Sequence, residues 1–305
     1  MKRIGTTTPT PHPAPQQAEA VRSYRQLCVH HDPRHAVAWC YMHASPRPCF
    51  TPELLEELHH LRYRLVREIR AGKPVRFVVL ASDVPGVFNL GGDLALFLEL
   101  ARNQDREGLL RYGRACIDIL WENHIHLGED LTTISLVQGD ALGGGFETAL
   151  ASNVLIAERG SKLGFPEILF NLFPGMGAYS LLLRRAGPVV AERLITSGKL
   201  YEASELYEMG VIDILADAGE GERAVYDYIR QADKAPGGMS AIRRVVDRCS
   251  RLEYQELLDV VELWVDTALQ LRERDMRLME RFVRRQTQRS ATETGDADNT
   301  VEQAG

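Results

Sequence analysis

The clearest periodic pattern in the first third of the chain is a run of apolar residues at helical spacing. Its members recur at intervals of four and three residues, which places them on one face of a helix. They are Leu54, Leu58, Leu61, Leu65 and Ile69. Thr51 is suited to cap this helix, and Pro52 fits its first position. The pattern predicts an amphipathic helix that packs its apolar face on a core.

Short runs of β-branched and apolar residues indicate strands before and after this helix. Residues 27–30 and 36–42 flank a turn signal at 31–34 and predict a hairpin. Residues 75–81 and 133–138 are continuous apolar runs, typical of strands buried on both faces of a parallel sheet. The pattern continues with helices at 94–101, 109–121, 178–185, 190–196 and 203–209, and with strands at 153–157 and 211–215. This alternation predicts an α/β core.

Beyond residue 220 the apolar positions follow a helical period, and no strand pattern remains. Residues 1–17 and 290–305 lack such a period and are too hydrophilic to offset the entropy of ordering, so we expect disordered tails there. The expected organisation is therefore an α/β core over residues 18–220 and a helical C-terminal region over 221–289, between tails at 1–17 and 290–305.

Composition narrows the class of protein. The 305 residues are 45% hydrophobic and carry a formal net charge of −6. An acidic balance argues against general binding to nucleic acid or to anionic membranes. The five cysteines are scattered, which favours neither a disulfide framework nor a zinc site, and a reducing cytoplasm fits best. No segment reads as a signal peptide or as a membrane span.

Two glycine-rich turns follow predicted strands and lead into helical sequence. The first lies in the segment SDVPGVFNLGGD at 82–93, and the second contains Gly143, Gly144 and Gly145. Glycines let bare backbone N–H groups approach a ligand, and a helix N-terminus favours negative charge. If the two turns lie side by side, the amides of Leu90 and Gly144 could hold one oxyanion. Packing alone could also explain a single glycine turn.

Two carboxylates accompany the second turn. Glu147 lies in the first turn of the predicted helix, and Glu167 follows in a Gly-Phe-Pro-Glu loop. Each has an ordinary explanation, as a residue favoured by the helix dipole and as an exposed loop charge. Together they could remove a proton next to a carbonyl and protonate a departing hydroxyl. Desolvation by apolar neighbours should raise the pKa of one carboxyl. These neighbours are Phe146, Leu163, Phe165 and Phe170.

Other chemical signals are weak. The histidines lack HExxH spacing, Ser135 and Ser180 lack a GxSxG elbow, and the chain has no phosphate-binding loop motif. His59, His60, His124 and His126 are therefore given no role. The basic pairs at 184–185 and 284–285 are expected on solvated helix faces, with contact to a phosphopantetheine carrier as the alternative.

The motifs FNLGGDL at 88–94, VQGDALGGGFE at 137–147 and GFPEILFNLFPGMGAYS at 164–180 resemble those of the crotonase (enoyl-CoA hydratase/isomerase) superfamily. This resemblance implies a spiral of repeated ββα units. It also implies an oxyanion hole at Leu90 and Gly144 and catalytic carboxylates at Glu147 and Glu167. Members of this superfamily form trimers or dimers of trimers, so a homotrimer or homohexamer is expected.

A closer resemblance, through FNLGGDLALF, LVQGDALGGGFE, PEILFNLFPGMGAYS and ELWVDTALQL, is to the diffusible signal factor synthases of bacterial quorum sensing. It implies dehydration of a 3-hydroxyacyl thioester on acyl carrier protein to a cis-2-enoyl product, and then hydrolysis to the free acid. No separate cofactor is expected, because phosphopantetheine or coenzyme A carries the substrate. The receiver domain of a sensor kinase is a further implied partner.

The acyl chain must be buried in a pocket, and apolar residues near or beyond the motifs are candidates for its walls. These are Met176, Gly177, Trp264 and Phe282. Two alternative functions stay open. One is an ordinary enoyl-CoA hydratase that shares both glutamates and does not hydrolyse the thioester. The other is a crotonase-fold binding protein without catalysis.

Overall fold

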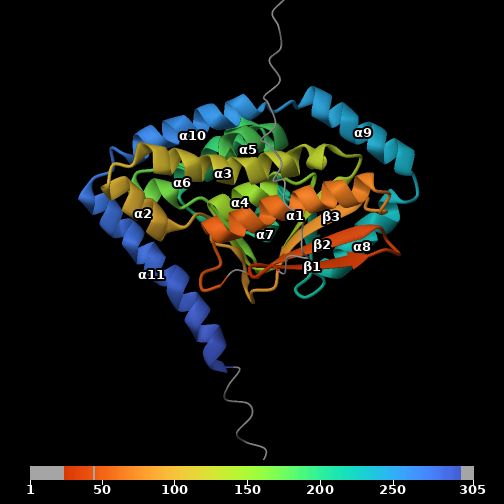
Figure 1. Ribbon diagram of the computed structural model, residues 1–305, viewed down its shortest axis with the longest axis horizontal. Coiled ribbons are helices and arrows are strands. Elements are labelled where there is room, and N and C mark those ends of the chain that lie inside the picture. Colours follow the sequence, from red (N-terminus) through yellow and green to blue (C-terminus); the bar gives the residue numbers. More distant parts are fainter. Residues whose placement is uncertain (1–23, 44, 297–305) are drawn as a thin grey trace, which may run out of the picture.

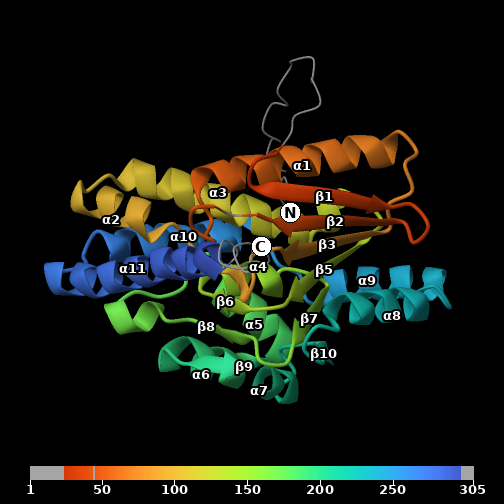
Figure 2. The ribbon, with the colours of Figure 1, turned by 90° about the horizontal axis from the view of Figure 1, so that it is seen from below.

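The computed structural model describes residues 24–43 and 45–296, so the predicted tail at 1–17 lies outside the described residues. Two sheets form its centre. The larger has six strands in the order β1-β2-β3-β5-β7-β10, and the smaller has four in the order β4-β6-β8-β9. Figure 2 shows the strands of the larger sheet side by side in this order. The pairs β2–β3, β3–β5, β5–β7 and β7–β10 are parallel.

The N-terminal hairpin and the first helix follow the sequence pattern closely. Strands β1 (Leu27–Asp32) and β2 (Val37–Met42) pair antiparallel. Helix α1 (Pro52–Arg70) begins where Thr51 accepts a hydrogen bond from the Leu54 amide with its side chain. The α1 leucines at 54, 58, 61 and 65 are buried, and the helix packs on α3 and β1. Both predictions are confirmed.

Three consecutive strand pairs give the chain its spiral. Strands β3 (Phe77–Ser82), β5 (Thr132–Val137) and β7 (Val154–Glu158) belong to the larger sheet. Each is followed by a strand of three residues in the smaller sheet, namely β4 (Val87–Asn89), β6 (Asp140–Leu142) and β8 (Lys162–Gly164). Helices α2 (Leu94–Arg102) and α3 (Arg106–His124) follow β4, and α4 (Gly144–Leu150) follows β6. The expected α/β fold of ββα units is confirmed.

The remaining core elements are short. They are η1 (His126–Gly128), η2 (Glu167–Phe170), α5 (Ala178–Ala186), α6 (Pro188–Ser197), β9 (Leu200–Glu202), α7 (Ala203–Glu208) and β10 (Ile214–Ala216). The sequence pattern missed β4, β6, β8 and β9, because three residues cannot display an alternating pattern.

Four helices follow the last strand. They are α8 (Gly221–Ala232), α9 (Pro236–Cys249), α10 (Tyr254–Ala268) and α11 (Glu273–Asp296). Helix α10 packs on α3, and α11 packs on α2 and η2. Figure 1 shows the C-terminal part of α11 extending beyond the other elements. Because α11 continues to Asp296, the tail predicted to start at residue 290 begins within a helix, and the residues from 297 lie outside the described part.

The larger sheet separates two hydrophobic cores. On one face, Leu80 and Leu155 join the helices α1, α3 and α10 in a large cluster. On the other face, Val79 and Ile156 pack with Val225 and Ile229 of α8. Alternate residues of β3 and β7 thus serve opposite cores, as the geometry of a strand requires. In the described part of the chain, no helix is both long and apolar enough to span a membrane.

Candidate active site

The two glycine-rich turns lie against each other, as the sequence predicted. A Cβ added to Gly91 would lie 2.8 Å from the Leu142 carbonyl oxygen and 3.1 Å from the Gly144 nitrogen. Gly91 also has a φ of 91°, a backbone conformation that favours glycine. The exit of β4 therefore meets the start of α4 at a distance that only a residue without a side chain permits.

The hydrogen bonds of the first turn correct one predicted residue. The Leu90 amide donates to the Pro48 carbonyl at 2.7 Å, and the Gly91 amide donates to Asn89 Oδ1 at 2.8 Å. Leu90 is therefore wrong as an oxyanion donor, because its N–H group is already used. Among the described residues the Gly92 amide has no hydrogen-bond partner, and Gly92 lines the cavity described below. Gly92 is the candidate donor from this turn.

A tyrosine and an aspartate hold this first turn in place. The Tyr112 hydroxyl accepts a hydrogen bond from the Asp93 amide at 2.7 Å and donates one to the Phe50 carbonyl at 2.8 Å. The Asp93 carboxylate accepts from two amides at the start of α2 and pairs with Arg47 at 2.9 Å. These bonds fix the backbone on both sides of the Gly92 amide.

The second turn connects the end of β6 to the start of α4 and leaves the Gly144 amide available. Gly143 precedes α4 with a φ of 50° and offers no side-chain cap. Gly144 is the first residue of α4, so its N–H group has no partner within the helix. The amides of Gly92 and Gly144 both belong to the wall of one cavity. Two such donors can stabilise negative charge on a carbonyl oxygen.

Glu147 is buried in the first turn of α4, with 1% of its surface exposed. Its Oε1 atom accepts hydrogen bonds from the Met176 amide at 2.8 Å and the Ala178 amide at 2.9 Å. Burial raises the pKa of Glu147 to about 7, although these two backbone bonds favour the ionised form. Glu147 can therefore give or take a proton near neutral pH.

Glu167 begins η2 beside Gly143, and a side chain at Gly143 would collide with its Oε1 atom. Its Oε2 atom is buried without a hydrogen-bond partner in the described structure. Burial, and next the charge of Glu147, raise the pKa of Glu167 to about 8. The pKa values of both carboxyls are thus raised towards neutrality, and the two amide donors favour the ionised form of Glu147.

A cavity of about 380 Å³ contains both carboxylates. Its other walls are largely apolar and come from α2, α3, α10 and α11. Met176, Trp264 and Phe282, which the sequence offered as candidates for the walls of a pocket, lie in these walls. Of the apolar neighbours predicted for the carboxylates, Phe170 lines the cavity. The other three, Phe146, Leu163 and Phe165, are buried in the core behind it.

Gly177 was predicted to contact the substrate, but it is not among the residues that line this cavity. Its φ of 108° and its packing against Leu257 explain why glycine stands there. This left-handed residue turns the chain so that the amides before and after it, from Met176 and Ala178, both reach Glu147.

The four histidines that were given no role and the basic pair at 184–185 lie away from the cavity. The histidines at 59, 60, 124 and 126 are not among its lining residues. Arg184 pairs with Glu256 at 2.8 Å, and Arg185 pairs with Asp213 at 2.6 Å. This arginine pair therefore ties α5 to α10 and to the segment before β10.

A spiral of ββα units that encloses two carboxylates beside unpaired amides is the layout of the crotonase class. Residues 35–258 match the family model described as enoyl-CoA hydratase/isomerase, and the chain belongs to this family.

Known proteins of similar sequence and structure carry related names. The chain is 27% identical over 231 residues to the probable mitochondrial enoyl-CoA hydratase 2 of Arabidopsis thaliana, which covers 75% of this chain and 74% of that protein. It is 29% identical over 195 residues to human mitochondrial methylglutaconyl-CoA hydratase, which covers 62% of this chain and 55% of that protein. The structure of human mitochondrial delta3-delta2-enoyl-CoA isomerase has a TM-score of 0.71 at 20% identity, covering 86% of this chain and 98% of that one.

Proposed function

We propose that this chain dehydrates a 3-hydroxyacyl thioester carried on acyl carrier protein to a cis-2-enoyl thioester, and then hydrolyses that product to a free cis-2-unsaturated fatty acid. This is the activity of a diffusible signal factor synthase. The observation that carries the proposal is the place of the segment ELWVDTALQL, which bears the finer resemblance. It lies in and just after α10 and supplies Trp264 to the wall of the cavity that contains Glu147 and Glu167.

The first step uses the shared proton of the two carboxylates. The thioester oxygen binds the amides of Gly92 and Gly144, which stabilise an enolate as the α-proton leaves. The ionised carboxylate takes this proton, and the protonated one gives its proton to the departing β-hydroxyl, which leaves as water. The pair again holds one proton when the double bond has formed. Glu147 and Glu167 suit these roles because the pKa values of both are raised towards neutrality.

The second step uses the same amides on a different intermediate. A water molecule, deprotonated by a carboxylate, attacks the thioester carbon, and the amides of Gly92 and Gly144 hold the resulting oxyanion. The C–S bond then breaks, the sulfur takes a proton from the carboxylic acid, and the free fatty acid is released. No separate nucleophile is needed for this step.

The test combines the purified protein with 3-hydroxydodecanoyl acyl carrier protein and follows products by mass spectrometry and chromatography against cis and trans standards. We expect a free cis-2-dodecenoic acid, lost in Glu147→Gln and Glu167→Gln. A trans-2-enoyl thioester without free acid would instead identify an enoyl-CoA hydratase type of reaction, which the names of the sequence relatives favour. The absence of any turnover on acyl carrier protein and coenzyme A thioesters would favour a binding protein.

A further inference from the structure

A second depression lies on the outside of the wall that α11 and η2 contribute to the cavity. One side is formed by Ile168 and Leu169 of η2, and the other by residues of α11. The α11 residues are Arg274, Asp275, Arg277, Leu278 and Arg281, and Asn171 follows η2. We call this depression the arginine groove. In Figure 2, η2 is the short green helix between α11 and α6, and both helices contact it.

The arginine groove and the cavity lie on opposite sides of η2 and α11. From η2, Glu167 and Phe170 face the cavity, and from α11, Met279 and Phe282 do so. The ring centroids of Phe170 and Phe282 lie 5.6 Å apart, so these two side chains pack against each other where η2 contacts α11. Since Ile168 directly follows Glu167 in the chain, a molecule bound in the groove lies one residue away from a reacting carboxylate.

The apolar surface of the groove continues to a cavity residue. Ile168 is 43% exposed and Leu169 is 52% exposed. Both lie beside Gly198, where an added Cβ would be 3.0 Å from Ile168 and 2.8 Å from Leu169. Leu200, which starts β9 just after Gly198, is 43% exposed and also lines the cavity. Leu200 therefore borders both the cavity and the protein surface next to the groove.

The charge of the groove is unusual for this chain, which has a net charge of −6. Arg102 of α2 pairs with Glu273 at 3.1 Å and with Glu280 at 2.7 Å, so two acids of α11 are already engaged. Arg277 and Arg281 are exposed, and in the described part of the chain neither has a carboxylate within ion-pair distance. Asp275 also lines the groove but pairs with Arg274 at 3.2 Å, so Arg277 and Arg281 are its cationic side chains without an ion pair among the described residues.

We propose that the arginine groove is the docking surface for the acidic acyl carrier protein that brings the substrate. This proposal rests on the proposed function and adds the place at which the carrier binds. Arginine is enriched at protein interfaces, contiguous exposed apolar surface marks interaction sites, and complementary charge speeds association and fixes register. A carrier docked there presents its prosthetic group next to Leu200, which borders both the surface and the cavity.

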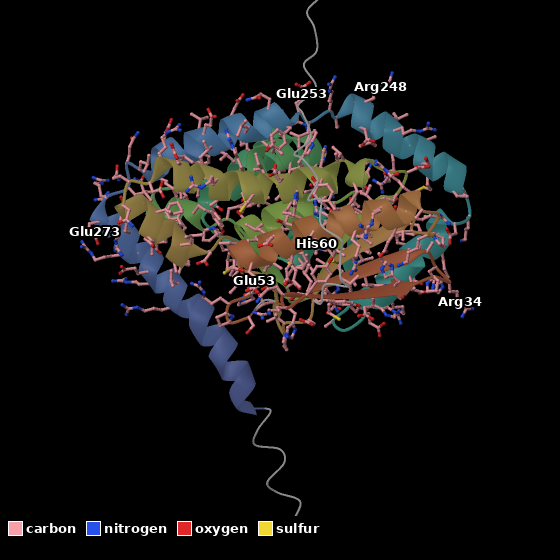
Figure 3. The ribbon with its side chains drawn as sticks, in the orientation of Figure 1. Arg34, Glu53, His60, Arg248, Glu253 and Glu273 are labelled. Carbon is pink, nitrogen blue, oxygen red and sulfur yellow. The ribbon has the colours of Figure 1, made fainter. Side chains whose placement is uncertain are left out.

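The direct test measures binding of acyl carrier protein that carries a 3-hydroxydodecanoyl group through an amide in place of the thioester, so that the analogue resists hydrolysis. The variant is Arg277→Glu with Arg281→Glu, and its control is Arg244→Glu with Arg248→Glu on α9, which has the same spacing and charge change. Figure 3 shows Arg248 far from Glu273 at the start of α11. We expect the dissociation constant of the α11 variant to rise by roughly tenfold or more, with a weaker salt dependence, and that of the control to change by less than about twofold.

A kinetic arm separates docking from chemistry. The α11 variant should lose activity on the 3-hydroxydodecanoyl carrier protein but keep it on the N-acetylcysteamine thioester of the same acid, which has neither phosphate nor carrier. Equal binding by the variant and the wild type would overturn the proposal, as would an equal loss on the N-acetylcysteamine thioester. An equal loss on the coenzyme A thioester would also overturn it, because the arginines would then recognise phosphate alone. If the carrier binds as expected but no free cis acid forms, the docking surface stands and the proposed function fails.

Discussion

Replacing Glu147 by glutamine should make the protein more stable at alkaline pH while removing most of its activity. Glutamine keeps the Oε1 acceptor that the amides of Met176 and Ala178 use, but it has no charge to desolvate. Activity should fall by roughly 100-fold, because the amide cannot transfer a proton. The residue would thus be a case in which a catalytic group lowers stability.

The magnitude follows from the raised pKa. The pKa of the Glu147 carboxyl is 4.5 in its ordinary state and about 7 in the folded protein. The folded state therefore binds the proton more tightly than the unfolded state, so stability falls as pH rises between these two values. This carboxyl costs about 3 kcal/mol above the folded pKa, which corresponds to roughly 5 °C in Tm. The glutamine variant should also relieve the repulsion on Glu167, an effect of the same sign.

The assay is thermal unfolding of both proteins at about pH 5 and about pH 8, with the difference in Tm between variant and wild type as the readout. The difference should become more positive at the higher pH. Glu158→Gln is the control, because Glu158 is also buried and accepts from the Gly219 amide at 2.9 Å and the Gly221 amide at 2.8 Å, outside the cavity. That variant should be less stable than wild type at about pH 8, since it loses charge-assisted hydrogen bonds. An unchanged difference between the two pH values for Glu147→Gln would refute the argument.

Three further substitutions test other parts of the site. Gly144→Val should keep the fold by circular dichroism but lower turnover by roughly 100-fold, because its side chain would press on Met176 and displace a donor. Phe282→Ala should favour longer acyl chains. Each buried CH₂ adds about 0.8 kcal/mol, so two more carbons change the ratio of longer to shorter free acids about fifteenfold. The control Leu263→Ala, at a site 64% exposed, should leave this ratio unchanged. Tyr112→Phe should lower kcat by roughly tenfold with little change in KM, because it frees the backbone next to the Gly92 amide. A normal kcat would show that the hydroxyl is dispensable.

The sequence predicted that Glu147 and Glu167 lie at one site because their local motifs determine their positions, and the catalytic role of the two carboxylates stays a prediction. Gly143 and Gly144 must lack side chains for the turns and Glu167 to meet, so the glycine pattern itself reports the close approach. Glu147 follows within the same helix turn. The positions of Glu147 and Glu167 therefore follow from the residues next to them in the sequence.

Long-range contacts explain what the sequence did not predict. The motif alone cannot distinguish the amides of Leu90 and Gly92, because the choice depends on Pro48, which lies far earlier in the chain and binds the Leu90 N–H group. The roles of Asn89 and Tyr112 likewise arise from bonds that form only in the folded structure. No local signal points to the Gly92 amide, because Asp93 is the N-cap of α2 and Gly92 precedes the helix amides that lack partners.

The C-terminal helices are part of the active site because α10 holds the loop that orients Glu147. An added Cβ at Gly175 would overlap the indole of Trp264, and one at Gly177 would overlap Leu257, so both glycines lie directly against α10. Between and after them, Met176 and Ala178 donate the hydrogen bonds that favour the ionised Glu147. Trp264 therefore touches both the cavity that contains the two carboxylates and the loop that holds Glu147. Any change of Trp264 should alter chain preference and the pH dependence of turnover together, whereas a change of Phe282 should alter chain preference alone.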